Sequence, residues 1–187
     1  MITDALVAFV PVGSPLSLVG ANGQTFASNV LDLLGQGVGT APQNIIGTRT
    51  VFGTDQGVGG LRPELNITVG TAFVASVAGT LLKIALQAAA DQGAAGNYQP
   101  STWTDVASQD GITPANLTAG AVPARFPFLP TMPPGLEPRY LRLLFSPMTA
   151  TALPSGDFSA GTILSALVTM VRDDQSNKFA AKNFAVA

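Results

Sequence analysis

Acidic side chains are the main groups in this sequence that could perform acid–base chemistry. The chain has no histidine and no cysteine. A Ser-His-Asp triad, a cysteine nucleophile, a disulfide and an imidazole or thiolate metal site are therefore excluded. The carboxylates that could form a glycosidase pair are scattered: Glu64, Asp105, Asp110 and Glu137. No motif brings two of them together, as hydrolysis of a glycoside requires, so we expect a protein that is not an enzyme.

Two further patterns carry weak signals for ligand binding. Asp173 and Asp174 are adjacent, but a hard divalent cation needs a nearly complete shell of oxygen ligands, and a solvated turn explains the pair better. The run Gly35–Thr40 has the glycine content of a phosphate loop, yet no helix or lysine follows it in register. We predict no catalytic residues, no metal and no cofactor.

Charge is scarce along the whole chain. Charged residues make up 11% of the 187 residues, and the net charge is −2, whereas typical soluble domains are about 25% charged. The scattered lysines and arginines form no basic footprint for nucleic acid. The longest uncharged apolar stretch, residues 65–82, is too polar to span a membrane. Much of the surface must be neutral, as expected of a protein that other subunits cover.

Short segments of alternating polarity predict β-strands. In Leu65–Val69, Leu81–Gln87 and Arg139–Phe145, every second residue is apolar, which is the pattern of a half-buried strand. Ile163–Val171 is apolar in both phases and predicts a strand buried on both faces. Shorter strands are expected at Leu6–Val10, Ser28–Leu34 and Thr102–Ala107.

Glycine and proline divide the chain between these strands. There are 20 glycines and 14 prolines, and the segments Gly93–Pro100 and Phe128–Pro138 are predicted loops. The predicted fold is all-β, a jelly-roll-like antiparallel β-sandwich with long Gly/Pro-rich loops and extended terminal arms. We expect one sandwich domain over residues 1–174, with a glycine-rich excursion or arm at residues 35–64, and a C-terminal tail over residues 175–187.

The run Arg139–Leu143 contains two candidate interface residues. If its leucines face the core, Tyr140 and Arg142 project outward, and tyrosine and arginine are enriched at protein interfaces. An ordinary strand with an amphipathic outer face explains them equally well. Trp103, the single tryptophan, is expected in the core rather than as a platform for a sugar.

The C-terminal tail contains three more candidate interface residues. Phe179, Phe184 and Val186 follow or interrupt a polar segment. Exposed apolar ends fray in a monomer, so this composition favours docking onto a neighbouring subunit. Packing of the tail back onto its own domain is the alternative.

Several motifs, in this order, resemble those of the capsid cement (decoration) proteins of short-tailed phages, such as those of Bordetella phages. The motifs are Leu82–Gln87, Trp103–Val106, Arg139–Leu143 and Phe158–Thr162, followed by a closing strand into Asp173. The resemblance extends over roughly Gly79–Asp174, about half of the chain. The Arg-Tyr-Leu-Arg run followed by a strand that starts with Ala-Gly is its most specific part.

The resemblance implies a virion structural protein with a jelly-roll fold. Such a protein binds the outer surface of the phage head, bridges neighbouring coat subunits and stabilises the shell. Its partners would be the major capsid protein and further copies of itself, as a homodimer or other homo-oligomer, with no nucleic acid and no membrane. Its location would be the capsid exterior of the virion, after assembly in the host cytoplasm. The alternative is a β-sandwich ligand- or carbohydrate-binding module of a phage particle, with Trp103 and Tyr98 lining a groove.

Overall fold

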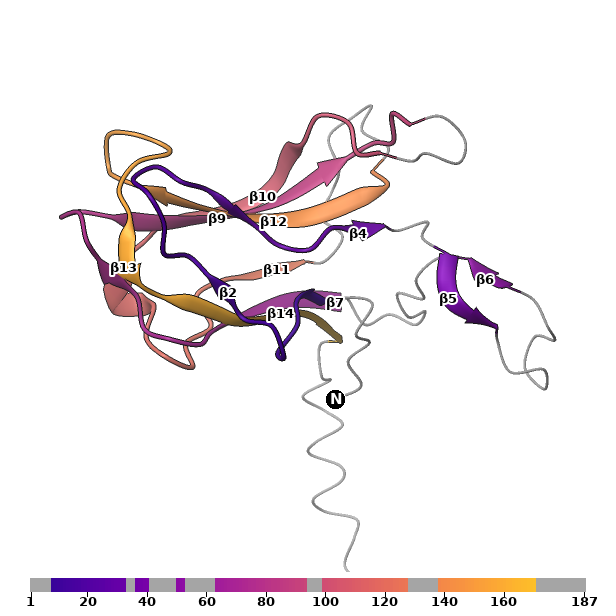
Figure 1. Cartoon of the computed structure of the whole chain (residues 1–187), viewed down its shortest axis with the longest axis horizontal. Coiled ribbons are helices and arrows are strands. Elements are labelled where there is room, and N and C mark those ends of the chain that lie inside the picture. Colours follow the sequence, from indigo (N-terminus) through magenta and orange to yellow (C-terminus); the bar gives the residue numbers. More distant parts are fainter. Residues whose placement is uncertain are drawn as a thin grey trace, which may run out of the picture.

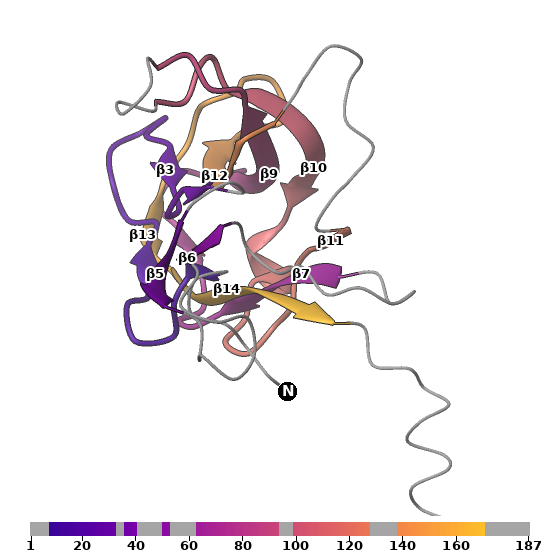
Figure 2. The same cartoon turned by 90° about the vertical axis from the view of Figure 1, so that its right-hand side faces the viewer.

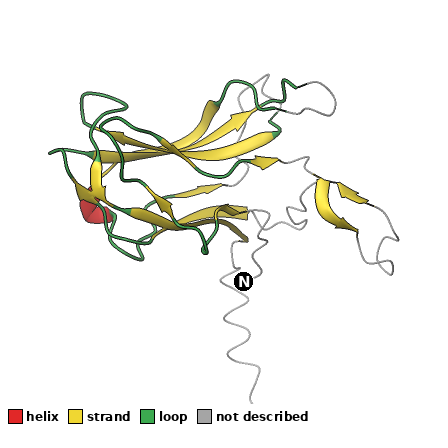
Figure 3. Cartoon of the chain, in the orientation of Figure 1, coloured by secondary structure: helices red, strands yellow, loops and turns green. Residues whose placement is uncertain are grey.

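Two antiparallel β-sheets packed face to face make up the body of the protein (Figures 1 and 3). The computed structural model describes residues 8–32, 36–40, 50–52, 63–93, 99–127 and 138–170. The first sheet contains β1 (Ala8–Val10), β2 (Leu16–Ser17), β7 (Pro63–Val69), β11 (Arg125–Pro127) and β14 (Thr162–Met170). The second sheet contains β3 (Phe26–Ala27), β4 (Leu31–Asp32), β9 (Leu81–Ala89), β10 (Thr104–Ile112) and β12 (Tyr140–Met148). The predicted all-β sandwich is confirmed.

Strand pairing is nested, so that early strands pair with late ones. β9 pairs with β10, and outside them β7 pairs with β11. β3 and β4 then pair with β12, while β1 and β2 pair with β14. The resulting orders are β1-β14-β7-β11 in the first sheet and β10-β9-β12-β3 in the second. Viewed along the long axis, β9, β10 and β12 lie above β7 and β14 (Figure 2).

The core lies between the two sheets and has the predicted alternation. Every second residue of β7 is fully buried, and so is every second residue in the first part of β9 and of β12. These core residues are Leu65, Ile67 and Val69, Leu82, Ile84 and Leu86, and Leu141, Leu143 and Phe145. The strand predicted at Ile163–Val171 is β14. Ile163 and Ala166 are buried, but Leu164 and Leu167 are only half-buried, so its outer face is less covered than we expected.

The strand predicted at Ser28–Leu34 is present as β4 alone within the described residues, and β3 ends just before this segment. Between β3 and β4 the chain makes other hydrogen bonds. The Ser28 hydroxyl accepts the Leu143 N–H at 2.8 Å in place of a backbone carbonyl. The next N–H, that of Asn29, donates across to the carbonyl of Phe9 in the first sheet at 3.0 Å. The backbone N–H groups of Leu143 and Asn29 thus both have hydrogen-bond partners where the chain contacts the edges of both sheets.

Two smaller sheets complete the described structure. β8 (Val74–Ala75) and β13 (Phe158–Ala160) pair at one end of the sandwich. β5 (Gln36–Thr40) and β6 (Thr50–Phe52) pair only with each other, beyond the opposite end (Figure 1). This second pair falls within the predicted excursion at residues 35–64, although β7 already begins at Pro63. Gln36–Thr40 is a β-strand and not a loop, so the phosphate-loop interpretation has no support in the described residues.

Candidate functional site

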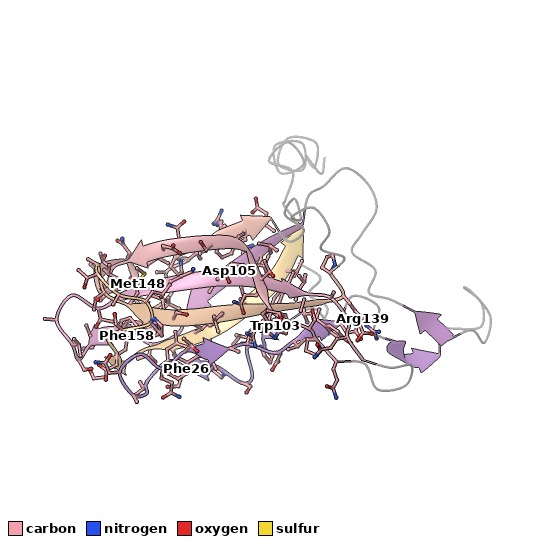
Figure 4. The ribbon with its side chains drawn as sticks, turned by 90° about the horizontal axis from the view of Figure 1, so that it is seen from above. Phe26, Trp103, Asp105, Arg139, Met148 and Phe158 are labelled. Atoms are coloured by element: carbon pink, nitrogen blue, oxygen red, sulfur yellow. The ribbon has the colours of Figure 1, made fainter. Side chains whose placement is uncertain are left out.

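A strip of polar and aromatic side chains crosses the outer face of the second sheet. The guanidinium of Arg142 stacks on the ring of Trp103, with Cζ 4.2 Å from the ring centroid. Arg142 Nε donates to Gln87 Oε1 at 2.8 Å, and Gln87 Nε2 donates to Asp105 Oδ1 at 2.7 Å. Lys83 Nζ lies 2.9 Å from the other carboxylate oxygen of Asp105. Figure 4 shows Trp103 and Asp105 on this face.

The charges of this strip satisfy one another. Burial opposes ionisation of Asp105, but hydrogen bonds from Gln87 and Lys83 outweigh it and hold the pKa of Asp105 below its usual range. The hydrogen bond to Asp105 in turn raises the pKa of Lys83. Arg142 does lie on the outer face, as predicted, but it is half-buried and engaged with Trp103 and Gln87. The strip is a self-contained network.

Two predicted side-chain positions are wrong. Tyr140 was expected to project outward as an interface residue, but it is only 5% exposed. The Arg139 guanidinium carbon lies 5.2 Å from its ring centroid, and its hydroxyl lies 3.5 Å from Asp91 Oδ1. Trp103 was expected in the core, but it is half-exposed on the outer face beneath Arg142. In both cases a neighbouring arginine covers the aromatic ring, which apolar periodicity does not predict.

Arg139 joins three segments at the end of the sandwich nearest β5 and β6 (Figures 1 and 4). Its Nε and one terminal nitrogen donate to the two carboxylate oxygens of Asp32, at 3.0 and 2.9 Å. Its other terminal nitrogen donates to Asp91 at 2.7 Å. Asp91 also accepts the N–H groups of Gly93 and Gln99, both at 3.0 Å. The cluster holds β4, the loop after β9 and the start of β12 together, which is a structural role.

The opposite end of the sandwich is almost free of charge. Four segments meet there, at the left of Figure 1: residues 18–25, 70–80, 113–124 and 149–162. Backbone hydrogen bonds join them, from Gly23 to Gly156 at 2.9 Å, from Phe73 to Leu117 at 3.0 Å and from Ser76 to Asp157 at 3.1 Å. Among all residues of these segments, Asp157 alone is charged. We call this surface the neutral end.

The neutral end exposes apolar side chains from all four of its segments. Their exposed fractions range from 37% to 53%, and the residues are Val19, Val74, Val77, Val122 and Leu153. Of the other large apolar residues that are exposed in the described structure, Val12 and Val30 lie outside these segments. A group of exposed apolar residues with little charge around it is typical of a protein-binding surface.

Aromatic packing beneath the neutral end fixes its loops. Phe73 and Phe158 pack edge to face, with ring centroids 5.0 Å apart and planes at 84°. Gly161, between β13 and β14, has a φ of +146°, and a Cβ atom there would lie 2.4 Å from the Phe73 ring. Only glycine fits this conformation and this space. The segments that carry the exposed valines are therefore attached to a packed core.

The remaining predicted interface residues lie outside the described part of the chain. These residues are Phe179, Phe184 and Val186. Tyr98, Asp173 and Asp174 also lie outside it.

Sequence reasoning missed the neutral end, although one signal was available: four glycine- or proline-containing segments that lack lysine, arginine and glutamate. The fold brings these distant segments together.

Other kinds of site have little support within the described residues. No group of three or more carboxylates there could hold a metal ion, and no helix there has the length and apolar character of a membrane span. One small cleft of about 120 Å³ lies between the β1–β2 turn and β3, lined in part by Phe9, Leu16 and Asn29. Binding pockets for small molecules usually enclose about 300–1,000 Å³, so this cleft is small for a ligand.

Comparison with family models and curated proteins identifies no relative of this chain. No protein-family model matches the sequence, and no curated protein matches it. The neutral end and the resemblance described from the sequence are therefore the two grounds for a function.

Proposed function

We propose that this protein is a non-enzymatic capsid decoration protein, which attaches through its neutral end to the outer surface of a phage head and bridges coat subunits. The observation that carries the proposal is that the four almost uncharged segments at one end of the sandwich expose five valine and leucine side chains. The resemblance to phage cement proteins supplies the identity of the partner, the major capsid protein.

The neutral end is suited to a weak contact that is repeated many times over the shell. Burial of apolar area stabilises a complex by about 25 cal/mol per Å² before the costs of association are subtracted. A few exposed aliphatic residues therefore give a modest affinity for each site. On a shell, every bridging molecule engages more than one subunit, and the effective concentration of the second contact multiplies the affinity.

We also propose that the sandwich is a jelly roll. The nested pairing of β1 and β2 with β14, of β3 and β4 with β12, of β7 with β11 and of β9 with β10 supports this assignment. A jelly roll arises when such a nested ribbon of four strand pairs wraps into two four-stranded sheets. Counting β1 with β2, and β3 with β4, as single broken strands gives this arrangement.

A carbohydrate-binding module is the second candidate, and the half-exposed Trp103 is the observation that favours it. Stacking of a sugar needs a free aromatic face, and Arg142 already occupies one face of this ring. Binding to a glycan array that is lost in Trp103→Ala, with the fold intact, would support this second candidate over the first.

The proposal is tested with substitutions that place a charge in the neutral end. Val74→Asp and Leu153→Asp should each weaken binding to expanded heads prepared without this protein by about 30-fold, or roughly 2 kcal/mol, as expected at the centre of an interface. The matched control is Val30→Asp, because Val30 is 46% exposed but lies between β3 and β4, outside the neutral end. Co-sedimentation with heads measures the affinity, and unfolding curves confirm the fold. Equal binding by all three variants and the wild type would refute the role of this surface.

A further inference from the structure

The outer edge of β10 is the longest open strand edge in the described structure. β10 has nine residues, most of them exposed, and among the described strands it pairs with β9 alone. The other edges of the two large sheets are short. β1 and β11 have three residues each, β11 includes Pro127, and β3 and β4 have two each. Because short strands and prolines prevent the addition of a further strand, β10 is the edge with room for one.

Two acidic residues give this edge a negative charge. Asp105 binds Gln87 and Lys83 on the outer face of the sheet. Asp110 is exposed and forms no ion pair with a described residue. β10 contains no lysine or arginine. Like charges on paired strands oppose pairing, so a second β10 strand fits this edge poorly and a basic strand fits it well.

A bulge in β10 sets the spacing of the two carboxylates. Asp105 pairs with Gln87, and Gln109 pairs with Ile84. Four residues of β10 thus advance as far as three residues of β9, because one residue of β10 is extra. Asp110 follows Gln109 directly. It therefore lies five residues after Asp105 in the sequence, but only four positions away along a regular neighbouring strand.

The C-terminal tail has basic residues at this spacing. Residues 175–187 contain Lys178 and Lys182, four positions apart, and no acidic residue. Positions four apart lie on the same face of a strand. An antiparallel strand that places Lys178 opposite Asp110 therefore also places Lys182 opposite Asp105. Each lysine then meets a carboxylate on the outer face of the sheet.

The same register gives an apolar residue of the tail a place on the inner face. Phe179 follows Lys178, so its side chain points to the opposite face of an added strand. On the core side of β10, Val106 and Ala107 pack against the core but are only partly buried. Phe179 would cover this apolar surface, and burial of apolar area stabilises the contact.

We propose that residues 178–183 of one copy add as an antiparallel strand to the outer edge of β10 in a neighbouring copy. Charge complementarity and the shared spacing of lysines and aspartates carry the inference. It goes beyond the proposed function, because it concerns contacts between copies of this chain and does not require the head.

The direction of the strands indicates that the tail comes from another copy. β14 starts at the neutral end and runs away from it, so the tail leaves the sandwich at the opposite end. β10 begins at that same end and runs toward the neutral end. The tail of the same chain would therefore reach β10 running parallel to it. All strand pairs of the two large sheets are antiparallel, and antiparallel pairing is slightly more stable.

Single cysteines test the contact, since the full chain contains no cysteine of its own. In the proposed register Ala180 lies opposite Ser108, close enough for a disulfide. When full-length Ser108→Cys and Ala180→Cys variants are mixed and oxidised, mass spectrometry should find a disulfide-linked pair with one chain of each kind. The matched control mixes Ala180→Cys with Ser17→Cys, an exposed serine on β2 in the other sheet, and should give no such pair.

The cysteine experiment separates the two sources of the tail. If the mixed pair is absent, or forms equally with Ser17→Cys, docking on β10 is refuted. If a chain with both Ser108→Cys and Ala180→Cys forms a disulfide within itself while the mixture forms none, the tail docks on its own chain, which also overturns the inference.

Charge reversal tests the proposed ion pair in the full chain. Lys178→Glu should weaken self-association by about 10-fold or more in about 50 mM salt, because it places an acidic group against Asp110. Addition of Asp110→Lys to that variant should restore the affinity. The matched control is Arg125→Glu, an exposed basic residue on β11 with the same change in net charge, which should have no effect. Sedimentation velocity measures self-association, and unfolding curves confirm the fold.

Failure of this test is distinct from failure of the proposed function. An equal loss in Arg125→Glu, or no recovery on addition of Asp110→Lys, would refute the pairing of Lys178 with Asp110. None of these measurements uses phage heads, so the decoration role would stand after such a result. Conversely, a chain that does not bind heads can still pass both tests.

Discussion

At the scale of single residues, the charged side chains of the sandwich form ion pairs and cover aromatic rings. Arg139 binds Asp32 and Asp91, which joins segments that are distant in sequence. Lys83 binds Asp105 on the neighbouring strand β10. Arg142 covers Trp103 and Arg139 covers Tyr140, so that an arginine shields each of these aromatic rings. These contacts are partly exposed, and we expect them to orient loops more than to stabilise the fold.

The Asp91 cluster predicts sensitivity to acid. Hydrogen bonds from the Gly93 and Gln99 N–H groups, together with Arg139, hold the pKa of Asp91 below its usual range despite partial burial. Between that lowered pKa and the unfolded value of about 3.9, the unfolded chain binds more protons than the folded chain. The stabilising contribution of Asp91 is therefore complete above pH 4 and is lost as the pH falls through the folded-state pKa.

Asp91→Asn should reduce this dependence on pH. Urea unfolding midpoints of the wild type should fall between pH 5 and pH 2.5, and those of the variant should fall less, since asparagine does not titrate. Asparagine retains an oxygen that can accept the Gly93 N–H, so the loop keeps part of its support. Equal decreases in the two proteins would show that Asp91 does not contribute to the acid response.

At the scale of elements, Gly161, the single residue between β13 and β14, allows Phe73 to pack beneath the neutral end. Gly161 has a backbone conformation that other residues rarely adopt, and the Phe73 ring fills the space of its absent side chain. Phe73 in turn packs against Phe158 of β13. A strand pair of only two and three residues, β8 and β13, is thus supported by aromatic packing.

Gly161→Ala should destabilise the protein by about 1–3 kcal/mol, because the added methyl group strains the backbone and displaces Phe73. The control is Gly13→Ala, since a Cβ at Gly13 meets no atom within 4 Å, and its effect should be far smaller. Chemical unfolding at constant pH measures both changes. If Gly161→Ala matches the control, the close approach of Phe73 does not constrain this position.

At the scale of the whole molecule, the two ends of the sandwich have different character. One end is neutral and apolar, while the other contains the Arg139 cluster and lies nearest β5 and β6 (Figure 1). A protein with two distinct ends can contact one partner at one end and a different partner at the other. This difference agrees with the proposed bridging of coat subunits.

Heads that lack the protein should release DNA at a lower temperature than complete heads. Addition of the full chain should restore the wild-type release temperature. A chain without residues 179–187 should restore it only in part while unfolding at nearly the same temperature, if the tail docks on a neighbour as its sequence predicts. Fluorescent-dye access during heating measures release. Heads without the protein that are as robust as complete heads would exclude a stabilising role.

The sequence by itself determined four of the long strands, β7, β9, β12 and β14, and many of the residues that fill the core. Alternation in Leu65–Val69 and Leu81–Gln87 is a local property that follows from the two-residue repeat of a strand, and the structure confirms it. The scarcity of charge was also visible without a structure. Both features require knowledge only of neighbouring residues or of composition.

Only the tertiary structure decided which surfaces those strands present. The neutral end combines segments separated by more than 100 residues, such as Gly23 and Gly156, and their proximity follows from the nested pairing of strands. The burial of Tyr140 and the partial burial of Trp103 likewise depend on arginines that reach them from neighbouring positions and strands. Such contacts depend on how the two sheets wrap around one core, and a local pattern contains no information about that wrapping.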